Sequence, residues 1–147
     1  MLLHSGEILM FLCSQGSKVS SYLCTMGKTV VLGASPNPGR YSHIATKRLL
    51  EHDEEVWPVG MREGVIGSEA IITDRPLLKN IDTITLYVGP KNQESWKDYI
   101  FALQPKRVIF NPGTENPAME HELEERGIES EIACTLVLLS MGTYAIK

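Results

Sequence analysis

The stretch VVLGASPNPGRYSHIA, Val30 to Ala45, decides the fold that the sequence predicts. An apolar run stops at Gly33, a loop of Ser, Pro, Asn and Gly follows, and a helical pattern begins after Arg40. A continuous apolar run is typical of a strand that is buried on both faces of a parallel sheet. A strand, a glycine-containing loop and a helix in this order begin a β-α-β unit, in which such a loop often holds a phosphate.

The same alternation continues along the chain. The predicted strands are residues 28–33, 54–60, 82–89, 106–113 and 128–133, and the predicted helices are residues 41–52, 90–104, 115–127 and 134–142. Residues 62–81 are irregular and predict a short strand and a brief helix. Strands joined by helices in this rhythm pair in parallel and are covered on both faces. The expected fold is a Rossmann-like, doubly wound parallel sheet of about five strands in a three-layer αβα arrangement.

Two details of the first helix follow from its spacing. Tyr41, Ile44, Ala45 and Leu49 fall on one helical face, which predicts that this face packs on the sheet. His43 lies near the loop and is predicted to be an exposed helical histidine, with a contact to a bound phosphate as the alternative.

Length and composition describe one ordinary globular domain. The chain has 147 residues, 43% of them hydrophobic and 22% charged, and a net charge of -4, which argues against a nucleic-acid partner. Cys13, Cys24 and Cys134 form no CxxC pair, which favours a reducing cytoplasm. Residues 1–25 lack the features of a signal peptide and of a membrane span, so no membrane partner is expected. We interpret them as an extension, artefactual or a flexible arm, with a helical arm on a partner subunit as the alternative, and place the domain at 26–147.

In an open α/β sheet the ligand lies outside the carboxyl ends of the strands. In this sequence those ends are residues 33–40, 58–62, 87–90 and 111–114, followed by Cys134 and Thr135. The first loop combines Gly33, which lets the backbone turn sharply, the Ser35 hydroxyl and the Arg40 guanidinium with a helix N-terminus. These features predict a phosphate site, and an ordinary strand-to-helix turn is the alternative.

The loop differs from the two commonest nucleotide motifs. It lacks the Lys of GxxxxGK[ST] and the spacing of GxGxxG. The second strand is followed by WPVGMREG, with Arg62 where an NAD-binding protein has an acidic residue for the ribose. A cation at that place suits a phosphate on the ribose, as in NADP or in coenzyme A (CoA).

Four segments of the chain carry a family resemblance, in this order: VVLGAS, GRYSHIATKRLLEHDEEVWPVG, TITLYVGP and RVIFNPGTEN. With them the chain resembles the small stand-alone CoA-binding proteins, which are similar to the N-terminal domain of the succinyl-CoA ligase α subunit. The resemblance covers residues 27–144. NPGTEN differs from the Gln-Gly segment of many relatives, and the chain lacks the ligase's phosphohistidine domain. The resemblance therefore implies CoA or acyl-CoA as the ligand, and no ligase activity.

The resemblance also implies positions for the parts of the ligand. CoA phosphates would lie at Gly33, Ala34, Ser35 and Arg40. The adenosine and a nucleotide phosphate would lie at Pro58, Val59, Gly60 and Arg62. An apolar wall against the adenine or ribose would consist of Val88, Gly89 and Pro90. The pantetheine would pass Asn111, Pro112 and Gly113.

No catalytic or metal-binding pattern accompanies these residues. The four histidines have no metal-ligand spacing, and the sequence contains no G-x-S-x-G motif. Cys134 is interpreted as a structural cysteine at the start of a buried helix, with a reactive thiol near the CoA sulfur as the alternative. The prediction is CoA binding without catalysis or metal, in a monomer or a homodimer. An NADP-type oxidoreductase, a regulatory nucleotide-binding module, a CoA-dependent transferase and a partner-binding domain stay open as alternatives.

Overall fold

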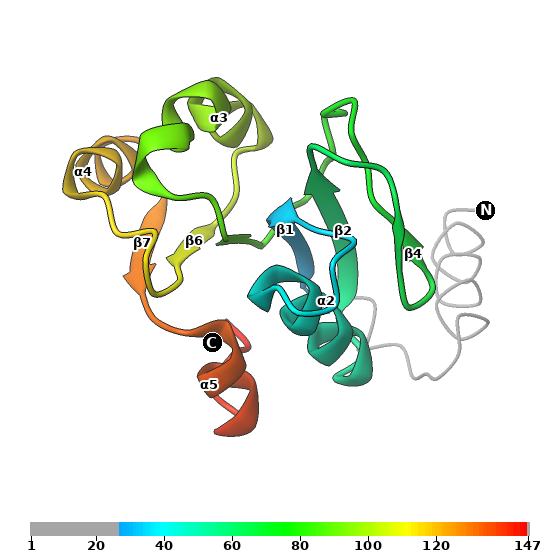
Figure 1. Cartoon of the computed structure of the whole chain (residues 1–147). Coiled ribbons are helices and arrows are strands. Elements are labelled where there is room, and N and C mark those ends of the chain that lie inside the picture. Colours follow the sequence, from blue (N-terminus) through cyan, green and yellow to red (C-terminus); the bar gives the residue numbers. More distant parts are fainter. Residues whose placement is uncertain (1–26, 147) are drawn as a thin grey trace, which may run out of the picture.

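The structure, a computed structural model, describes residues 27–146, so the expectation for residues 1–25 lies outside the described part. Five parallel strands form one sheet in the order β2-β1-β5-β6-β7 (Figure 1). They are β1 (Lys28–Ala34), β2 (Glu55–Gly60), β5 (Thr83–Leu86), β6 (Arg107–Phe110) and β7 (Glu129–Ile132). The helices are α2 (Tyr41–Glu51), α3 (Pro90–Leu103), α4 (Pro117–Glu125) and α5 (Thr135–Ser140). The Rossmann-like fold predicted from the sequence is confirmed.

The strand order reverses at β1. Strand β2 pairs with one side of β1, and the chain then crosses to β5 on the other side. The register places Val30 opposite Trp57 of β2 and opposite Ile84 of β5. In an open parallel sheet, the reversal leaves a crevice at the carboxyl ends of the two strands that meet there.

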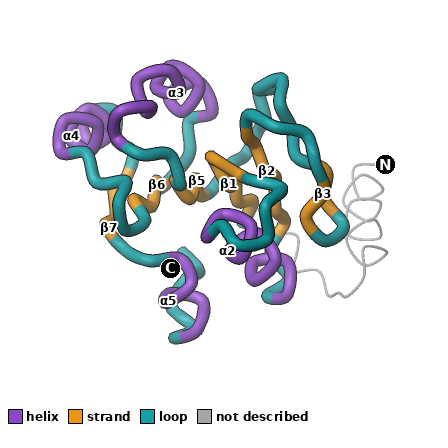
Figure 2. The backbone as a smooth tube through the Cα atoms, viewed as in Figure 1, coloured by secondary structure: helices purple, strands orange, loops and turns teal. Residues whose placement is uncertain are grey.

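Helices cover both faces of the sheet, with α3 and α4 on one side and α2 and α5 on the other (Figure 2). Alternate residues of each strand point to opposite faces. Val30 and Leu32 of β1 belong to the core under α3 and α4, together with Trp96 of α3. Val31, between them, belongs to the core under α2 and α5, together with Leu49. The continuous apolar runs of the sequence therefore reflect burial on two faces.

The long helices begin as their sequences predict. Pro90 and Pro117 are first residues of α3 and α4, where a missing N–H costs no helical hydrogen bond. The Asn116 side chain accepts a hydrogen bond from the Met119 N–H and caps α4. Gly127, just past the end of α4, has a φ of +76°, which favours glycine.

The irregular segment after β2 differs from its prediction. It forms an antiparallel hairpin of β3 (Val65–Ile66) and β4 (Glu69–Ala70), and the described residues 62–81 contain no helix. Ile72 then bonds to the outer edge of β2, where its N–H donates to the Pro58 carbonyl at 2.8 Å and its carbonyl accepts from the Gly60 N–H at 3.0 Å. The predicted brief helix is wrong because these residues instead cover the sheet edge.

The buried face of α2 also differs from its prediction. Tyr41 is 72% exposed and Ile44 is 36% exposed, whereas Ala45 and Leu49 are buried as expected. The buried side includes three polar residues, Ser42, His43 and Thr46. His43 was expected to be exposed, and it is 8% exposed because its ring turns toward the loop before the helix.

At the amino ends of the strands, a buried polar network closes the sheet. The Arg107 guanidinium donates to the Thr83 hydroxyl at 3.0 Å, to the Tyr144 carbonyl at 2.7 Å and to the Glu131 carboxylate at 3.1 Å. The hydroxyls of Thr29 and Tyr144 bond each other. The segment after α5 is therefore fixed to the first residues of β1, β5 and β6.

Candidate functional site

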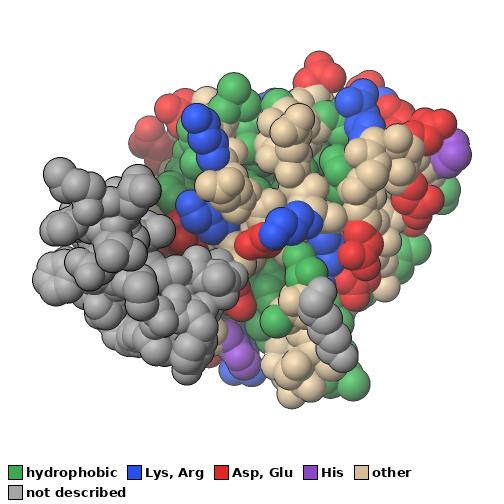
Figure 3. Space-filling model, turned by 180° about the vertical axis from the view of Figure 1, so that it is seen from behind, with side chains coloured by type: hydrophobic (Ala, Val, Ile, Leu, Met, Phe, Trp, Pro, Cys, Tyr) green, Lys and Arg blue, Asp and Glu red, His purple; other side chains and the backbone are tan. Residues whose placement is uncertain are grey.

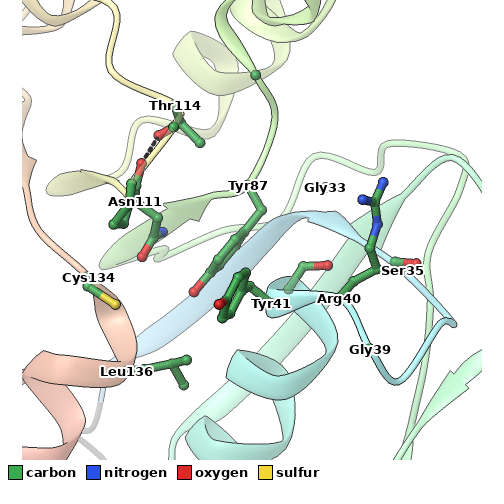
Figure 4. A pocket seen from close by; sticks show the side chains of 14 residues that line it. Gly33, Ser35, Gly39, Arg40, Tyr41, Tyr87, Asn111, Thr114, Cys134 and Leu136 are labelled. Atoms are coloured by element: carbon green, nitrogen blue, oxygen red, sulfur yellow. Dashed lines mark hydrogen bonds between the residues drawn. The ribbon is translucent and has the colours of Figure 1, made fainter.

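A cleft of about 620 Å³ opens at the carboxyl ends of β1, β5 and β6, where the strand order reverses (Figure 4). Its lining comes from four parts of the described chain: the end of β1 with the start of α2, the end of β5, the loop after β6, and the start of α5. The lining residues are Gly33, Ser35, Gly39, Arg40, Tyr41, Ser42, Tyr87, Gly89, Asn111, Pro112, Gly113, Thr114, Cys134 and Leu136.

Gly33 is required by the backbone at the edge of the cleft. Its φ is +95°, and a Cβ atom there would lie 3.0 Å from the Tyr87 carbonyl group. A side chain would both strain this conformation and press on the end of β5. The glycine thus lets the loop after β1 leave the sheet close to β5.

The loop after β1 is held by short-range hydrogen bonds. The Asn37 N–H donates to the Ser35 hydroxyl oxygen at 3.1 Å, and the Gly39 N–H donates to the Asn37 side-chain oxygen at 2.9 Å. The Arg40 N–H donates to the Asn37 carbonyl at 3.1 Å. Ser35 keeps its own hydroxyl proton for donation, and its side chain lines the cleft.

The N-terminus of α2 faces the cleft without a cap. No side chain caps the helix at Arg40, and its first turn contains no acidic residue. The N–H groups of Tyr41 and Ser42 bond to no other residue in the described part. Such a terminus carries about half of an elementary positive charge, and the exposed Arg40 guanidinium adds a full one. This wall of the cleft suits an anion.

The opposite wall is organised by Asn111, which is 1% exposed. Its amide nitrogen donates to the Thr85 hydroxyl at 2.7 Å and to the Leu86 carbonyl at 3.0 Å. Its amide oxygen accepts from the Thr135 N–H at 2.8 Å, at the start of α5. Because these bonds occupy the side chain, Asn111 joins β5, β6 and α5 and fixes the place of Cys134.

Gln93 of α3 fixes the same wall by bonding to the segments that follow β5 and β6. This side chain is 1% exposed, and its amide nitrogen donates to the Val88 carbonyl at 2.9 Å and to the Thr114 carbonyl at 2.7 Å. Its oxygen accepts from the Asn116 amide at 2.9 Å. The loop after β6 is therefore held rigidly next to the end of β5.

Tyr87 lies between the two walls in the close-up view (Figure 4). Its hydroxyl is the single buried side-chain nitrogen or oxygen of the described residues that has no hydrogen-bond partner. Burial raises the pKa of this phenol to about 12, so it stays protonated and able to donate. An unpaired buried hydroxyl costs free energy, which a ligand or a rearranged neighbour can recover.

Charge is sparse in the cleft and frequent elsewhere. From behind, acidic and basic side chains are interspersed over the described surface (Figure 3). Among the described lining residues, Arg40 is the single Lys, Arg, Asp or Glu. The cleft therefore has one cationic end at α2 and an uncharged end near Pro112, Cys134 and Leu136.

The cleft brings together part of the predicted site. The predicted residues that line it are Gly33, Ser35, Arg40, Gly89, Asn111, Pro112 and Gly113. The predicted residues that do not line it are Ala34, Pro58, Val59, Gly60, Arg62, Val88 and Pro90.

The second group has other roles in the fold. Ala34, Val59 and Val88 are buried core residues. Gly60 is needed by packing, since a Cβ atom there would lie 2.2 Å from the Ala34 carbonyl oxygen. Arg62 is exposed in the turn that leads from the edge strand β2 to the hairpin. These side chains therefore lie outside the cleft as the structure has it.

Other lining residues were not assigned from the sequence: Gly39, Tyr41, Ser42, Tyr87, Thr114, Cys134 and Leu136. Most of them lie within or beside the strand ends that the topology marks as a site. Cys134 is partly exposed and lines the cleft at the residue before α5, so it is less buried than expected. The signal that could have found Tyr87 is its place in the segment 87–90, which directly follows β5 and which the topology marks as a strand end.

Residues 27–146 contain neither a cluster of metal ligands nor a helix that could span a membrane. No three or more His, Cys, Asp or Glu side chains in this part gather as they would around a metal ion. None of its helices has the length and apolar character needed to cross a bilayer.

Solved structures with the same fold include several uncharacterised proteins. The structure of one uncharacterised protein shares 51% identity and a TM-score of 0.79, over 81% of this chain and 98% of that one. A conserved hypothetical protein from Pyrococcus furiosus shares 32% identity and a TM-score of 0.67, over 76% of this chain and 98% of that one. A hypothetical protein from Pyrococcus horikoshii shares 28% identity and a TM-score of 0.69, over 81% and 85%.

Sequence comparison identifies the family. None of the curated proteins compared with the sequence is a match. The family profile described as the CoA binding domain matches residues 27–140, which include every lining residue of the cleft. This match confirms the family resemblance predicted from the motifs and supports CoA binding in general. The chain belongs to the CoA-binding domain family.

Proposed function

We propose that this protein binds CoA or an acyl-CoA in the cleft, with the phosphates at the start of α2, and performs no reaction of its own. The observation that carries the proposal is the uncapped N-terminus of α2, where two unpaired N–H groups and Arg40 face a cleft that has no other charged lining residue in the described part. Backbone N–H groups and an arginine fork are a favourable combination for phosphate oxygens.

The two ends of the cleft match the two parts of this ligand. CoA joins a multiply phosphorylated nucleotide to an uncharged arm that ends in a thiol or a thioester. The cationic end at Arg40 suits the phosphates, and the uncharged end near Pro112, Cys134 and Leu136 suits the arm. The likeness to the CoA-binding domain of the succinyl-CoA ligase α subunit is part of this proposal.

The residues around the cleft support binding rather than catalysis. Its described lining has no carboxylate or imidazole that could act as a general acid or base. His43 donates to a backbone carbonyl, and His121 lies 3.4 Å from Glu125 on α4. Cys134 is the one nucleophilic thiol among the described lining residues, and an acyl-transfer role for it is an outcome that the experiment below includes.

Isothermal titration calorimetry of the full chain with three ligands tests the proposal: CoA, acetyl-CoA and NADP. We expect CoA and acetyl-CoA to bind and NADP to bind at least tenfold more weakly. Binding of NADP in preference to CoA would support the nucleotide-binding oxidoreductase instead. Release of free CoA from acetyl-CoA, with an acetylated Cys134 in mass spectrometry, would overturn the non-catalytic part.

The first variant pair tests the cationic end. Arg40→Ala should weaken CoA binding by about 1.5–3 kcal/mol, the contribution of a hydrogen bond to a charged group, and should leave the melting temperature nearly unchanged. Lys47→Ala is the matched control because Lys47 is an exposed cation on the same helix outside the cleft. Equal losses in both variants would mean that net charge, and not the site, attracts the ligand.

The proposal also includes a cytoplasmic location and a small-molecule partner. The oligomeric state is a separate part of it. Val137 and Met141 of the α5 region are 50% and 68% exposed, which supports a homodimer through this apolar side. Sedimentation velocity, with and without CoA, measures that state.

A further inference from the structure

The ring of His43 joins the body of α2 to the loop that forms the cationic end of the cleft. His43 is 8% exposed, and its Nδ1 lies 3.0 Å from the Ser35 carbonyl oxygen. His43 does not line the cleft, so this contact lies behind the loop and leaves the ligand side free. Nothing in the sequence pattern of the loop requires a histidine at this place.

The chemistry of the contact fixes the direction of the hydrogen bond. A carbonyl oxygen only accepts, so Nδ1 of His43 carries the proton and donates it. The bond therefore forms with the neutral Nδ1–H tautomer as well as with the charged ring, and it needs no imidazolium. A side-chain donor of the same geometry can replace it.

Apart from this bond, the loop is held by hydrogen bonds within itself and by one apolar contact. Residues 37–40 are exposed, and the side-chain bonds at Asn37 and Gly39 stay within the loop itself. Pro36 packs against the turn before β3, where a Cβ atom on Gly64 would lie 2.5 Å from the Pro36 Cβ. Within the described residues, the His43 bond is thus the one side-chain hydrogen bond from α2 to the loop. A loop that is ordered before binding loses less conformational entropy when the ligand arrives.

We propose that His43 is a positioning residue that preorganises the loop after β1 for phosphate binding, through the Nδ1–H bond to the Ser35 carbonyl. The inference deepens the proposed function and rests on it for the ligand. It assigns His43 no contact with the phosphate. The groups that contact the phosphate are the Ser35 hydroxyl and the N–H groups at the start of α2.

Two substitutions separate the hydrogen bond from the bulk of the ring. In His43→Asn, the amide nitrogen occupies nearly the position of Nδ1 and keeps a donor, whereas His43→Leu fills similar space without one. We expect His43→Leu to weaken CoA binding roughly 3- to 10-fold, which corresponds to one lost neutral hydrogen bond. His43→Asn should bind within about twofold of the natural protein. His121→Leu, on the exposed surface of α4, is the control and should change nothing.

A second measurement follows the loop without any ligand. Amide hydrogen exchange at Gly39 and Arg40, whose N–H groups bond within the loop, should be faster in His43→Leu than in His43→Asn, since the loop opens more often. In the natural protein, ¹⁵N NMR of the ring should report a protonated Nδ1, which tests the bond even where the leucine variant does not fold.

The outcomes are distinct. The positioning role would be overturned if His43→Leu had the same CoA affinity and the same amide exchange as the natural protein. It would also be overturned if the His43 ring of the natural protein were protonated on Nε2 alone. A loss in His43→Asn as large as in His43→Leu would instead indicate a direct role of the ring with the phosphate. If the natural protein does not bind CoA, the proposed function fails, while the exchange and NMR measurements still decide how His43 acts on the loop.

Discussion

At the amino ends of the strands, buried polar groups bond to one another, whereas at the carboxyl ends some polar groups have no partner in the described part: the N–H groups at the start of α2, which face the cleft, and the buried Tyr87 hydroxyl. Arg107 is 5% exposed and donates to three groups on different segments. At the other end, the Tyr87 hydroxyl and the first N–H groups of α2 have no protein partner in the described part. Saturated polar groups hold a fold together, and unsaturated ones are available to a ligand.

The two ends also differ in how their backbone is held. The amino end is fixed by side chains, with Thr29 and Tyr144 bonded across more than a hundred residues of chain. At the carboxyl end, Asn111 and Gln93 fix one wall of the cleft, while the other wall is a loop that leaves the sheet at Gly33, where φ is positive. Changes at the amino end should therefore affect folding, and changes in the loop after β1 should affect binding.

The largest expected effect is at Arg107. Arg107→Met removes a buried cation and leaves the Thr83 hydroxyl, the Tyr144 carbonyl and the Glu131 carboxylate without it. The Glu131 carboxylate is partly exposed, so the cost arises mainly at the two buried oxygens and should be about 2–4 kcal/mol of unfolding free energy, measured by urea denaturation. Lys106→Met is the matched control, because Lys106 is 72% exposed in its pair with Asp82 and should cost below about 1 kcal/mol. If Arg107→Met also lowered the unfolding free energy by less than about 1 kcal/mol, the network at the amino ends would not stabilise the fold more than a surface ion pair does.

The second effect concerns Glu54, just before β2. Burial first, and then the nearby Asp82, raise its pKa from 4.5 to about 7. A carboxyl whose pKa is raised in the folded state favours the fold below its ordinary pKa, and this contribution disappears as the pH rises from about 4.5 to 7. Glu54→Gln removes that dependence, so its melting temperature should exceed that of the natural protein more at pH 8 than at pH 5.

The group is half exposed, so solvent screening limits the gain at pH 8 to about 1 kcal/mol. If the difference between the Glu54 variant and the natural protein were the same at pH 5 and pH 8, Glu54 would titrate at its ordinary value.

The smallest effect compares two tyrosines, one at each end. Tyr87→Phe removes a hydroxyl that has no partner, so unfolding free energy should stay within about 0.5 kcal/mol or rise. Tyr144→Phe removes a hydroxyl bonded to Thr29 and should cost about 1 kcal/mol. Both variants are measured by urea denaturation without ligand. Equal losses would mean that the Tyr87 hydroxyl has a partner in solution.

The sequence predicts the architecture well because burial leaves a direct trace. Val30, Val31 and Leu32 form an unbroken apolar run because neighbours lie on both faces of the sheet. Asn116 and Pro117 predict the start of α4 because capping is local chemistry. The hairpin after β2 is not predictable in this way, since its strands are two residues long and depend on the edge that they cover.

The site is predictable to the level of strand ends and less so to the level of side chains. Topology places Gly33, Ser35 and Arg40 in the cleft because the loop after β1 lies where the strand order reverses. Which side chains point inward depends on tertiary contacts. Gly60 looks like a ligand-binding glycine in the sequence, but its lack of a side chain is needed by the Ala34 backbone. The sequence predicts that His43 is exposed, whereas in the structure its ring is buried and contacts the loop before α2.

One edge of the sheet has a consequence for how the protein behaves at high concentration. The hairpin segment covers β2, whereas β7 pairs only with β6 in the described part and begins with the exposed Glu129. Acidic side chains on an open edge discourage a strand of a second molecule from adding there. That protection is electrostatic, so dissolved salt screens it. Low ionic strength therefore favours a clear solution, and light scattering as salt is added would detect the loss of that protection.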